Sequence, residues 1–282
     1  MTFKTLIDAD SLQNLLAKPG LAVVDCRFDL MKPEAGRQAY LAAHIPGARY
    51  ADLNRDLAAP IGPHTGRHPL PSPEAFAARL GAMGIGNETQ VVAYDEANGS
   101  MAARLWWMLR WVGHGAVAVL DGGFNAWTAR GGALQSGDTT RHRVERFALI
   151  VDAKSIVTTA ELEHALRDPK TMLVDARAQE RYAGTVEPID SVPGHIPGAV
   201  NHPFSANLRP DGHFLSAAEL KRRWQERFPG RDVENLVAMC GSGVTACHNL
   251  LSLEVAGLTG GKLYAGSWSE WIRDPRRPIA RD

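Results

Sequence analysis

One cysteine of this chain stands in a setting that favours a reactive thiolate. Cys240 directly follows the apolar run 236–239, and the next residues read Gly-Ser-Gly-Val-Thr before a helical pattern at 246–256. The glycines let the chain curl so that successive N–H groups point inward and form an anion nest. The start of a helix adds positive potential. Both effects lower the pKa of a thiol, so we expect Cys240 to be a nucleophile rather than a buried core residue.

The sequence matches three other chemistries only weakly. The loop contains G-x-G-x-x-A, a dinucleotide fingerprint, but it lies late in its half of the chain and lacks the acidic residue expected about 20 positions on. A cysteine phosphatase needs an arginine where this chain has Ala246. His64 and His68 have a spacing that suits a metal, but Gly66 and Pro69 disfavour a helix there and no third ligand clusters nearby. We therefore expect neither a cofactor nor a metal.

The elements that must position the Cys240 loop occur twice in the chain. Asp25 to Asp175 is an offset of 150 residues, and His44 to His195 is an offset of 151. Such a repeat predicts two tandem domains, which agrees with a length of 282 residues. The repeated segments, in chain order, are AVVDCRF and MLVDARA, HIPGA and HIPGA, VVAYD and LVAMC, and VLDGGFNAW and LYAGSWSEW.

Each half alternates short apolar runs with helical patterns, which is typical of βαβ units. This predicts an α/β protein in which each domain is a parallel sheet with helices on both faces. We place the first domain at 1–135, a polar linker at 136–154 and the second domain at 155–282. Ligands of such sheets bind beyond the carboxyl ends of the strands, where Cys240 lies. In the second half, strands are expected at 172–175, 236–239 and 262–264, and helices at 162–166, 220–228 and 244–256.

Composition excludes several classes of protein. Lys+Arg is 31 and Asp+Glu is 31, so the net charge is zero and no basic field is present to hold nucleic acid or an anionic membrane. The most apolar stretch, 105–112, is interrupted by Arg110 and is much shorter than the ~18 residues of a membrane span. The three cysteines do not form a disulfide framework, which favours a reducing, cytoplasmic compartment.

Three features of the sequence together point to a known family. The doubled HIPGA, the loop CGSGVTA at 240–246 and GSWSEW at 266–271 resemble the two-domain rhodanese-type sulfurtransferases, and the loop is similar to that of the 3-mercaptopyruvate type. The resemblance implies two rhodanese-like domains, of which only the second is catalytic. The counterpart of Cys240 in the first domain is Asp95, and an aspartate cannot carry a persulfide. One active site per chain, in the cleft between the domains, is the expected result.

The resemblance also implies a mechanism in two transfers. Cys240 attacks the outer sulfur of a small donor and becomes a persulfide, which a thiophilic acceptor then takes. Cyanide, a thiol or a reduced thioredoxin-like protein would serve as the acceptor. The persulfide would be cradled by the backbone amides of Gly241, Ser242, Gly243, Val244 and Thr245.

Donor recognition is where the chain departs from the family patterns. Thiosulfate-type members carry cations in the loop, where this chain has the neutral Gly241 and Ser242. Mercaptopyruvate-type members bind a carboxylate with two upstream arginines. Arg181 matches the first of these, whereas Ile189 replaces the second. A single guanidinium can still bind a carboxylate through two hydrogen bonds, so we expect 3-mercaptopyruvate to be the favoured donor.

Four further residues are candidates for the site. Ser242 resembles a family serine that polarises or protonates the transferred sulfur, and His68 resembles a histidine linked to that serine. A helix-capping serine and a structural histidine are the alternatives. Arg67 and Met101 are expected to line the cleft. The rival functions are a thiosulfate-preferring enzyme of the same family and a carrier that passes persulfide sulfur between proteins without its own small donor.

Overall fold

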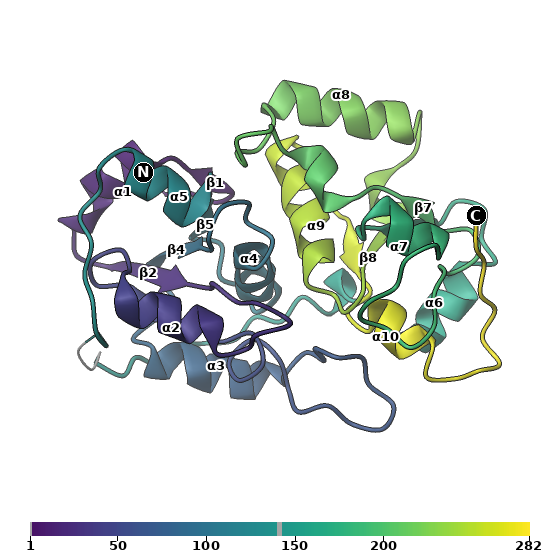
Figure 1. The fold of residues 1–282 in the computed structure, drawn as a ribbon, viewed down its shortest axis with the longest axis horizontal. Coiled ribbons are helices and arrows are strands. Elements are labelled where there is room, and N and C mark those ends of the chain that lie inside the picture. Colours follow the sequence, from purple (N-terminus) through teal and green to yellow (C-terminus); the bar gives the residue numbers. More distant parts are fainter. Residues whose placement is uncertain (1, 140–142) are drawn as a thin grey trace. The chain divides into compact units, whose positions relative to one another are not determined.

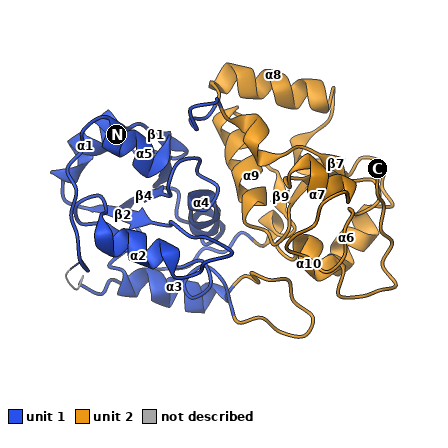
Figure 2. Cartoon of the chain, viewed as in Figure 1, with its two compact units in different colours: residues 1–59, 71–152, 209–214 blue, residues 60–70, 153–208, 215–282 orange. Residues whose placement is uncertain are grey.

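The computed structural model describes residues 2–139 and 143–282, which form two compact units coloured separately in Figure 2. The first unit comprises residues 1–59, 71–152 and 209–214, and the second comprises 60–70, 153–208 and 215–282. The short segment 60–70 therefore belongs to the second unit, although it comes from the first half of the chain. It carries Arg67 and His68. The expected linker, 136–154, is divided between the units after Asp152, and its residues 140–142 lie outside the described residues.

The first unit is built on a five-stranded parallel sheet with the strand order β1-β5-β4-β2-β3 (Figure 1). Buried side chains from both faces show that the sheet is covered on each side, as parallel sheets require. The strands are β1 (Leu6–Ile7), β2 (Leu21–Asp25), β3 (Arg49–Tyr50), β4 (Gln90–Tyr94) and β5 (Val117–Leu120).

Two helices of the first unit begin at residues whose side chains cap them. Asp8 accepts a hydrogen bond from the Ser11 amide, and Ser72 accepts one from the Ala75 amide with proline at the first helical position. One face of the sheet packs against Leu12, Tyr40 and Trp127, which come from three different helices. The helices are α1 (Ala9–Leu16), α2 (Ala35–Ala42), α3 (Pro73–Ala82), α4 (Ala102–Trp111) and α5 (Gly123–Ala129).

The second unit repeats this arrangement around a four-stranded parallel sheet with the order β7-β6-β8-β9 (Figure 1). Its core likewise joins three helices to one sheet face, through Leu162, Tyr182 and Trp271. The predicted tandem α/β fold is therefore confirmed. The elements are β6 (Met172–Asp175), β7 (Val200–Asn201), β8 (Leu236–Met239), β9 (Lys262–Leu263), α6 (Thr159–Ala165), α7 (Gln179–Ala183), α8 (Ala217–Arg227), α9 (Thr245–Val255) and α10 (Ser267–Trp271), with 3₁₀ turns at Ala153–Ser155, Phe204–Asn207 and Val233–Asn235.

The doubled Asp-x-Arg pattern forms a buried ion pair at the end of a strand in each unit. Arg27 Nη2 lies 2.7 Å from Asp25 and donates to the Ala43 carbonyl. Arg177 Nη2 lies 2.6 Å from Asp175 and donates to the carbonyl of Gly194. In each unit the arginine thus ties the end of a central strand to the residue before the HIPGA segment. The repeated aspartates are therefore structural.

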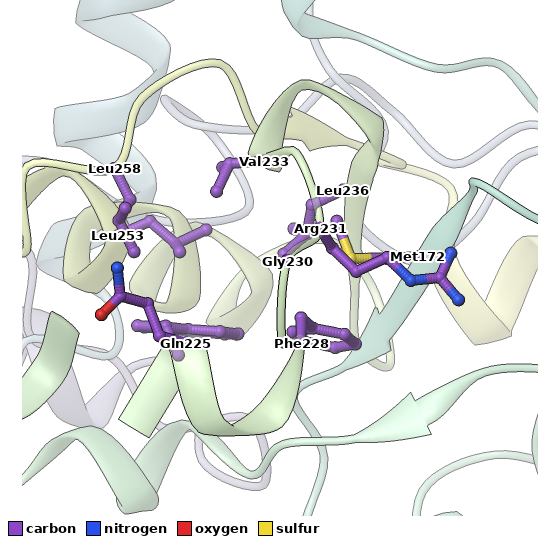
Figure 3. A pocket seen from close by; sticks show the side chains of 10 residues that line it. Met172, Gln225, Phe228, Gly230, Arg231, Val233, Leu236, Leu253 and Leu258 are labelled. Carbon is purple, nitrogen blue, oxygen red and sulfur yellow. The ribbon is translucent and has the colours of Figure 1, made fainter. Parts of the chain in front are cut away.

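Two further features bear on function. Across the described ranges, no helix combines the length and the apolar character that crossing a membrane requires. An apolar cavity of about 150 Å³ in the second unit lies beside Met172 and Leu236, the first residues of β6 and β8 (Figure 3). Cys240 follows the opposite end of β8, and no cysteine lines the cavity. The cavity is therefore separate from the Cys240 loop.

Candidate active site

The Cys240 thiol lies in a nest of backbone amides between β8 and α9. Its Sγ accepts hydrogen bonds from the amides of Gly243 at 3.1 Å and Ser242 at 3.5 Å, and the residue is buried. The curl needs glycine at 243, because φ there is +75° and a Cβ atom would lie 2.5 Å from the Ala265 carbonyl oxygen. Of the five amides predicted to cradle the sulfur, the structure shows those of Ser242 and Gly243 donating to it, and the cradling of a persulfide by residues 241–245 stays a prediction.

The nest changes the acidity of the thiol. Burial raises the pKa of Cys240, but hydrogen bonds from the Thr245 side chain and from loop amides outweigh burial, so the pKa lies below the ordinary thiol value. A lower pKa increases the fraction of thiolate at neutral pH, and the thiolate is the nucleophilic form. By contrast, burial raises the pKa of Cys26 well above its usual value, with nearby carboxylates adding to the effect. Of these two buried cysteines, only Cys240 has a lowered pKa.

Two serines at the start of α10 brace this loop, and sequence reasoning assigned them no role. The Cys240 amide donates to Ser267 Oγ at 3.0 Å, while the Ser267 hydroxyl donates to the Tyr264 carbonyl. Ser267 has φ of +53°, a strained conformation for a residue with a side chain, and it is the only non-glycine residue of the described ranges with positive φ. Ser269 Oγ accepts from the Arg67 amide at 3.0 Å. The signal was present in the GSWSEW segment, which sequence analysis used only as a family signature.

The segment 60–70 brings His68 to the Cys240 loop. His68 Nδ1 lies 2.7 Å from Ser242 Oγ, and both side chains are buried. The neighbouring backbone is held close to α10, because a Cβ atom on Gly66 would lie 2.5 Å from the Gly266 carbonyl oxygen. The structure therefore places His68 in direct contact with Ser242, which is two residues beyond Cys240 in the chain.

Two guanidinium groups lie against the residue that follows Cys240. A Cβ atom on Gly241 would lie 2.8 Å from Arg67 Nη2 and 3.5 Å from Arg181 Nη2. Burial lowers the pKa of Arg67, and the nearby Arg181 adds to this, whereas the negative charge of the Cys240 thiolate opposes it. The two predicted cationic residues thus converge beside the sulfur.

Both guanidiniums are already engaged by buried carboxylates. Arg181 donates to both oxygens of Glu187 at 2.8–3.1 Å and to Asp190 at 2.9 Å, and Asp190 also pairs with Arg67. The Glu187 and Asp190 side chains are each 3% exposed. These acids flank Ile189, the position where the sequence lacks a second arginine. Sequence reasoning missed them, since it searched that segment for a cation.

Met101 lies in the first unit, directly before α4, and its role in donor binding stays a prediction. Its amide donates at 2.8 Å to Asp95, the counterpart of Cys240. The amides of Gly99 and Ala102 also donate to this carboxylate, at 2.9 and 3.1 Å. The first-half loop therefore also forms an amide nest. The nest is built around a carboxylate, which reaches further from the backbone than a thiol does.

We expect Asp95→Cys to create no second persulfide. The shorter side chain leaves buried amides without their acceptor, which should lower the free energy of unfolding by about 1–3 kcal/mol. Urea unfolding measures this loss, and intact-mass spectrometry after treatment with donor counts the sulfur atoms added. Asp95→Asn is the matched control, because it keeps the length and one acceptor oxygen and should lose less stability. Two added sulfurs in Asp95→Cys would contradict the prediction.

A buried thiol in an amide nest, at the carboxyl end of a parallel strand in one of two repeated α/β units, defines a protein that works through a sulfur nucleophile. The model of the rhodanese-like domain matches residues 8–130 and 158–274, and the chain belongs to this family. The resemblance to the two-domain rhodanese-type sulfurtransferases is thereby confirmed.

Known proteins similar to the whole chain carry the names of two donors. The chain is 50% identical to a probable 3-mercaptopyruvate sulfurtransferase of Pseudomonas aeruginosa, covering 99% of both chains. It is 37% identical to a putative thiosulfate sulfurtransferase, SseB, of Mycobacterium tuberculosis, covering 99% of this chain and 97% of that one. The solved 3-mercaptopyruvate sulfurtransferase of Leishmania major is 33% identical with a TM-score of 0.85, covering 96% of this chain and 76% of that one.

Proposed function

We propose that this chain is a sulfurtransferase that carries sulfur on Cys240 and prefers 3-mercaptopyruvate as its donor. The observation that carries the proposal is the environment of the Cys240 thiol. Its pKa is lowered, it accepts hydrogen bonds from loop amides, and two guanidinium groups lie against the next residue, Gly241. An amide nest of this kind stabilises a thiolate before transfer and a persulfide anion after it. The same loop amides therefore stabilise Cys240 both as the free thiolate and as the persulfide anion.

In the first transfer, the Cys240 thiolate attacks the sulfur of 3-mercaptopyruvate. The new S–S bond forms as the donor's C–S bond breaks, and the electron pair of the broken bond passes to the pyruvate carbon. The hydrogen of the donor thiol ends on that carbon, so pyruvate leaves and Cys240 holds a persulfide anion. Ser242 and His68, 2.7 Å apart, form the pair of side chains that we assign to moving this proton.

In the second transfer, a thiophilic acceptor attacks the outer sulfur of the persulfide. With cyanide, the product is thiocyanate and the S–S electron pair returns to Cys240 as thiolate. With a thiol or a reduced thioredoxin-like protein, the sulfur passes to the acceptor's own sulfur. None of the three cysteines, all of which lie in the described ranges, forms a disulfide, which fits a reducing compartment, and we propose the cytoplasm.

Charge balance favours a donor with one negative charge. The positive charges of Arg67 and Arg181 are offset by the negative charges of Glu187 and Asp190, so the net charge of these four groups is zero. Thiosulfate carries two negative charges and finds no net counter-charge there. 3-Mercaptopyruvate carries one carboxylate, which the partly exposed face of a single guanidinium can bind.

The decisive experiment compares kcat/KM for 3-mercaptopyruvate and for thiosulfate with cyanide as the acceptor. We expect a higher value for 3-mercaptopyruvate. A higher value for thiosulfate would reverse the assignment of the donor and leave the enzyme class intact. Persulfide on Cys240 without steady-state turnover of either donor would instead identify a sulfur carrier.

Arg181→Ala should lower kcat/KM for 3-mercaptopyruvate by roughly 30- to 1000-fold, because a charge-assisted contact of on the order of 2–4 kcal/mol is lost. Arg181→Lys should recover only part of this, since an ammonium group lacks the planar fork. The measurement is steady-state kinetics with both donors, alongside urea unfolding to separate a loss of folding from a loss of binding. An equal loss for both donors in a folded variant would make Arg181 a structural residue.

A further inference from the structure

The buried carboxylate of Asp190 bridges the two guanidinium groups beside Cys240. One of its oxygens pairs with Arg67 Nη1, and the other accepts from Arg181 Nη2 at 2.9 Å. Asp190 comes from the loop after α7 and is 123 residues away from Arg67 in sequence. This single side chain therefore joins the segment 60–70 to the part of the second unit that carries Arg181.

The exposure of the four charged groups shows which of them can meet a donor. The Arg67 and Arg181 side chains are 22% and 17% exposed, whereas Asp190 and Glu187 are each 3% exposed. Arg67 Nε is buried and has no hydrogen-bond partner. The two arginine side chains thus retain accessible surface, while the carboxylates that neutralise them stay buried.

Glu187 holds this loop in place. Its Oε1 accepts the amides of Ile189 and Asp190, each at 3.0 Å. The Asp190 carboxylate is therefore fixed by its own backbone as well as by two arginines. A fixed buried negative charge acts on every anion that binds to those arginines, and it acts twice as strongly on a dianion as on a monoanion.

We propose that Asp190 is a positioning residue that sets donor selectivity: its carboxylate holds Arg67 and Arg181 beside Cys240 and offsets their charge, so that the site favours monoanionic over dianionic sulfur donors. This inference rests on the proposed sulfurtransferase function. Asp190→Asn keeps the size of the side chain and changes the sum of the four charges from zero to plus one. Thiosulfate gains more from this change than 3-mercaptopyruvate does.

The test is the ratio of kcat/KM for thiosulfate to kcat/KM for 3-mercaptopyruvate. We expect Asp190→Asn to raise this ratio about tenfold and Asp190→Glu, which keeps the charge, to stay closer to wild type. Asp168→Asn is the matched control, because it removes the same charge from an exposed position. Asp168 precedes β6 and therefore lies at the amino end of the strands, opposite the carboxyl end where Cys240 lies, so this variant should leave the ratio unchanged. A merely structural role would lower both values together and leave the ratio unchanged, which would overturn the proposal.

A second measurement does not depend on turnover. We expect iodoacetamide to alkylate the Cys240 thiolate, and peptide mapping distinguishes this site from the other cysteines. Sulfate should protect Cys240 at about tenfold lower concentration in Asp190→Asn than in wild type, whereas protection by pyruvate should change less. Equal changes for both anions would contradict the inference. If wild type forms no persulfide with either donor, the proposed function fails, and the two protection curves still decide the role of Asp190.

Discussion

Cys240→Ser should abolish sulfur transfer while the chain stays folded. A serine hydroxyl is not ionised at neutral pH and cannot form a persulfide, so kcat should fall by at least about 10⁴-fold. The hydroxyl can still accept the loop amides that now contact Sγ. The free energy of unfolding should therefore change by less than about 1 kcal/mol.

Intact-mass spectrometry gives the direct measurement. Wild type treated with donor should gain one sulfur per chain, and Cys240→Ser should gain none. Cys247→Ser is the matched control, because Cys247 is buried in α9, which follows the Cys240 loop, and its Sγ donates to the Gly243 carbonyl, a bond that serine retains. Two added sulfurs in wild type, or transfer that survives in Cys240→Ser, would overturn the assignment of a single site.

Arg177→Met should destabilise the protein by about 3–5 kcal/mol, the usual effect of removing one partner from a buried ion pair. Arg177 is 3% exposed and Asp175 is fully buried, so methionine would leave an uncompensated carboxylate in the core. The Gly194 carbonyl would also lose its donor, and Glu187 would lose a cation 3.5 Å away. Urea unfolding, compared with wild type, measures the loss.

An exposed arginine supplies the control for this prediction. Arg222 on α8 pairs with Glu219 and Glu226, and all three side chains are at least 31% exposed. Exposed pairs contribute about 0–1 kcal/mol, so Arg222→Met should have little effect. A loss at Arg177 no larger than that at Arg222 would show that the pair at the end of β6 does not stabilise the fold.

The sequence alone predicted the fold and the position of Cys240 at the end of a strand. Alternation of apolar runs and helical patterns is a local property, so strands at 172–175 and 236–239 could be placed within the limits that the structure shows. The internal repeat then fixed the number of domains. Cys240 could be placed at the edge of the sheet because a residue that directly follows a parallel strand must lie at the strand's carboxyl end.

The partners of the site residues were decided by the tertiary structure. Arg67 and His68 belong to the second unit, although the repeat assigns them to the first half of the chain. Ser242 lies 174 residues from His68, and neither the internal repeat nor a helix or strand period brings these two positions together. The sequence showed Glu187 and Asp190 only as polar neighbours of Ile189, because their role depends on which cations the fold brings within hydrogen-bond distance.

There is a physical reason why the sequence reveals the amide nest but not the charge of the site. The amide nest around Cys240 arises from consecutive residues, so its glycines, its cysteine and the start of a helix can be recognised in seven letters of sequence. The charge of the site arises from groups distant along the chain, and Coulomb energy depends on distance in space and on burial. The sequence by itself therefore determined that Cys240 lies at the end of a strand in a loop of backbone amides. Only the tertiary structure decided that buried carboxylates neutralise the arginines beside it.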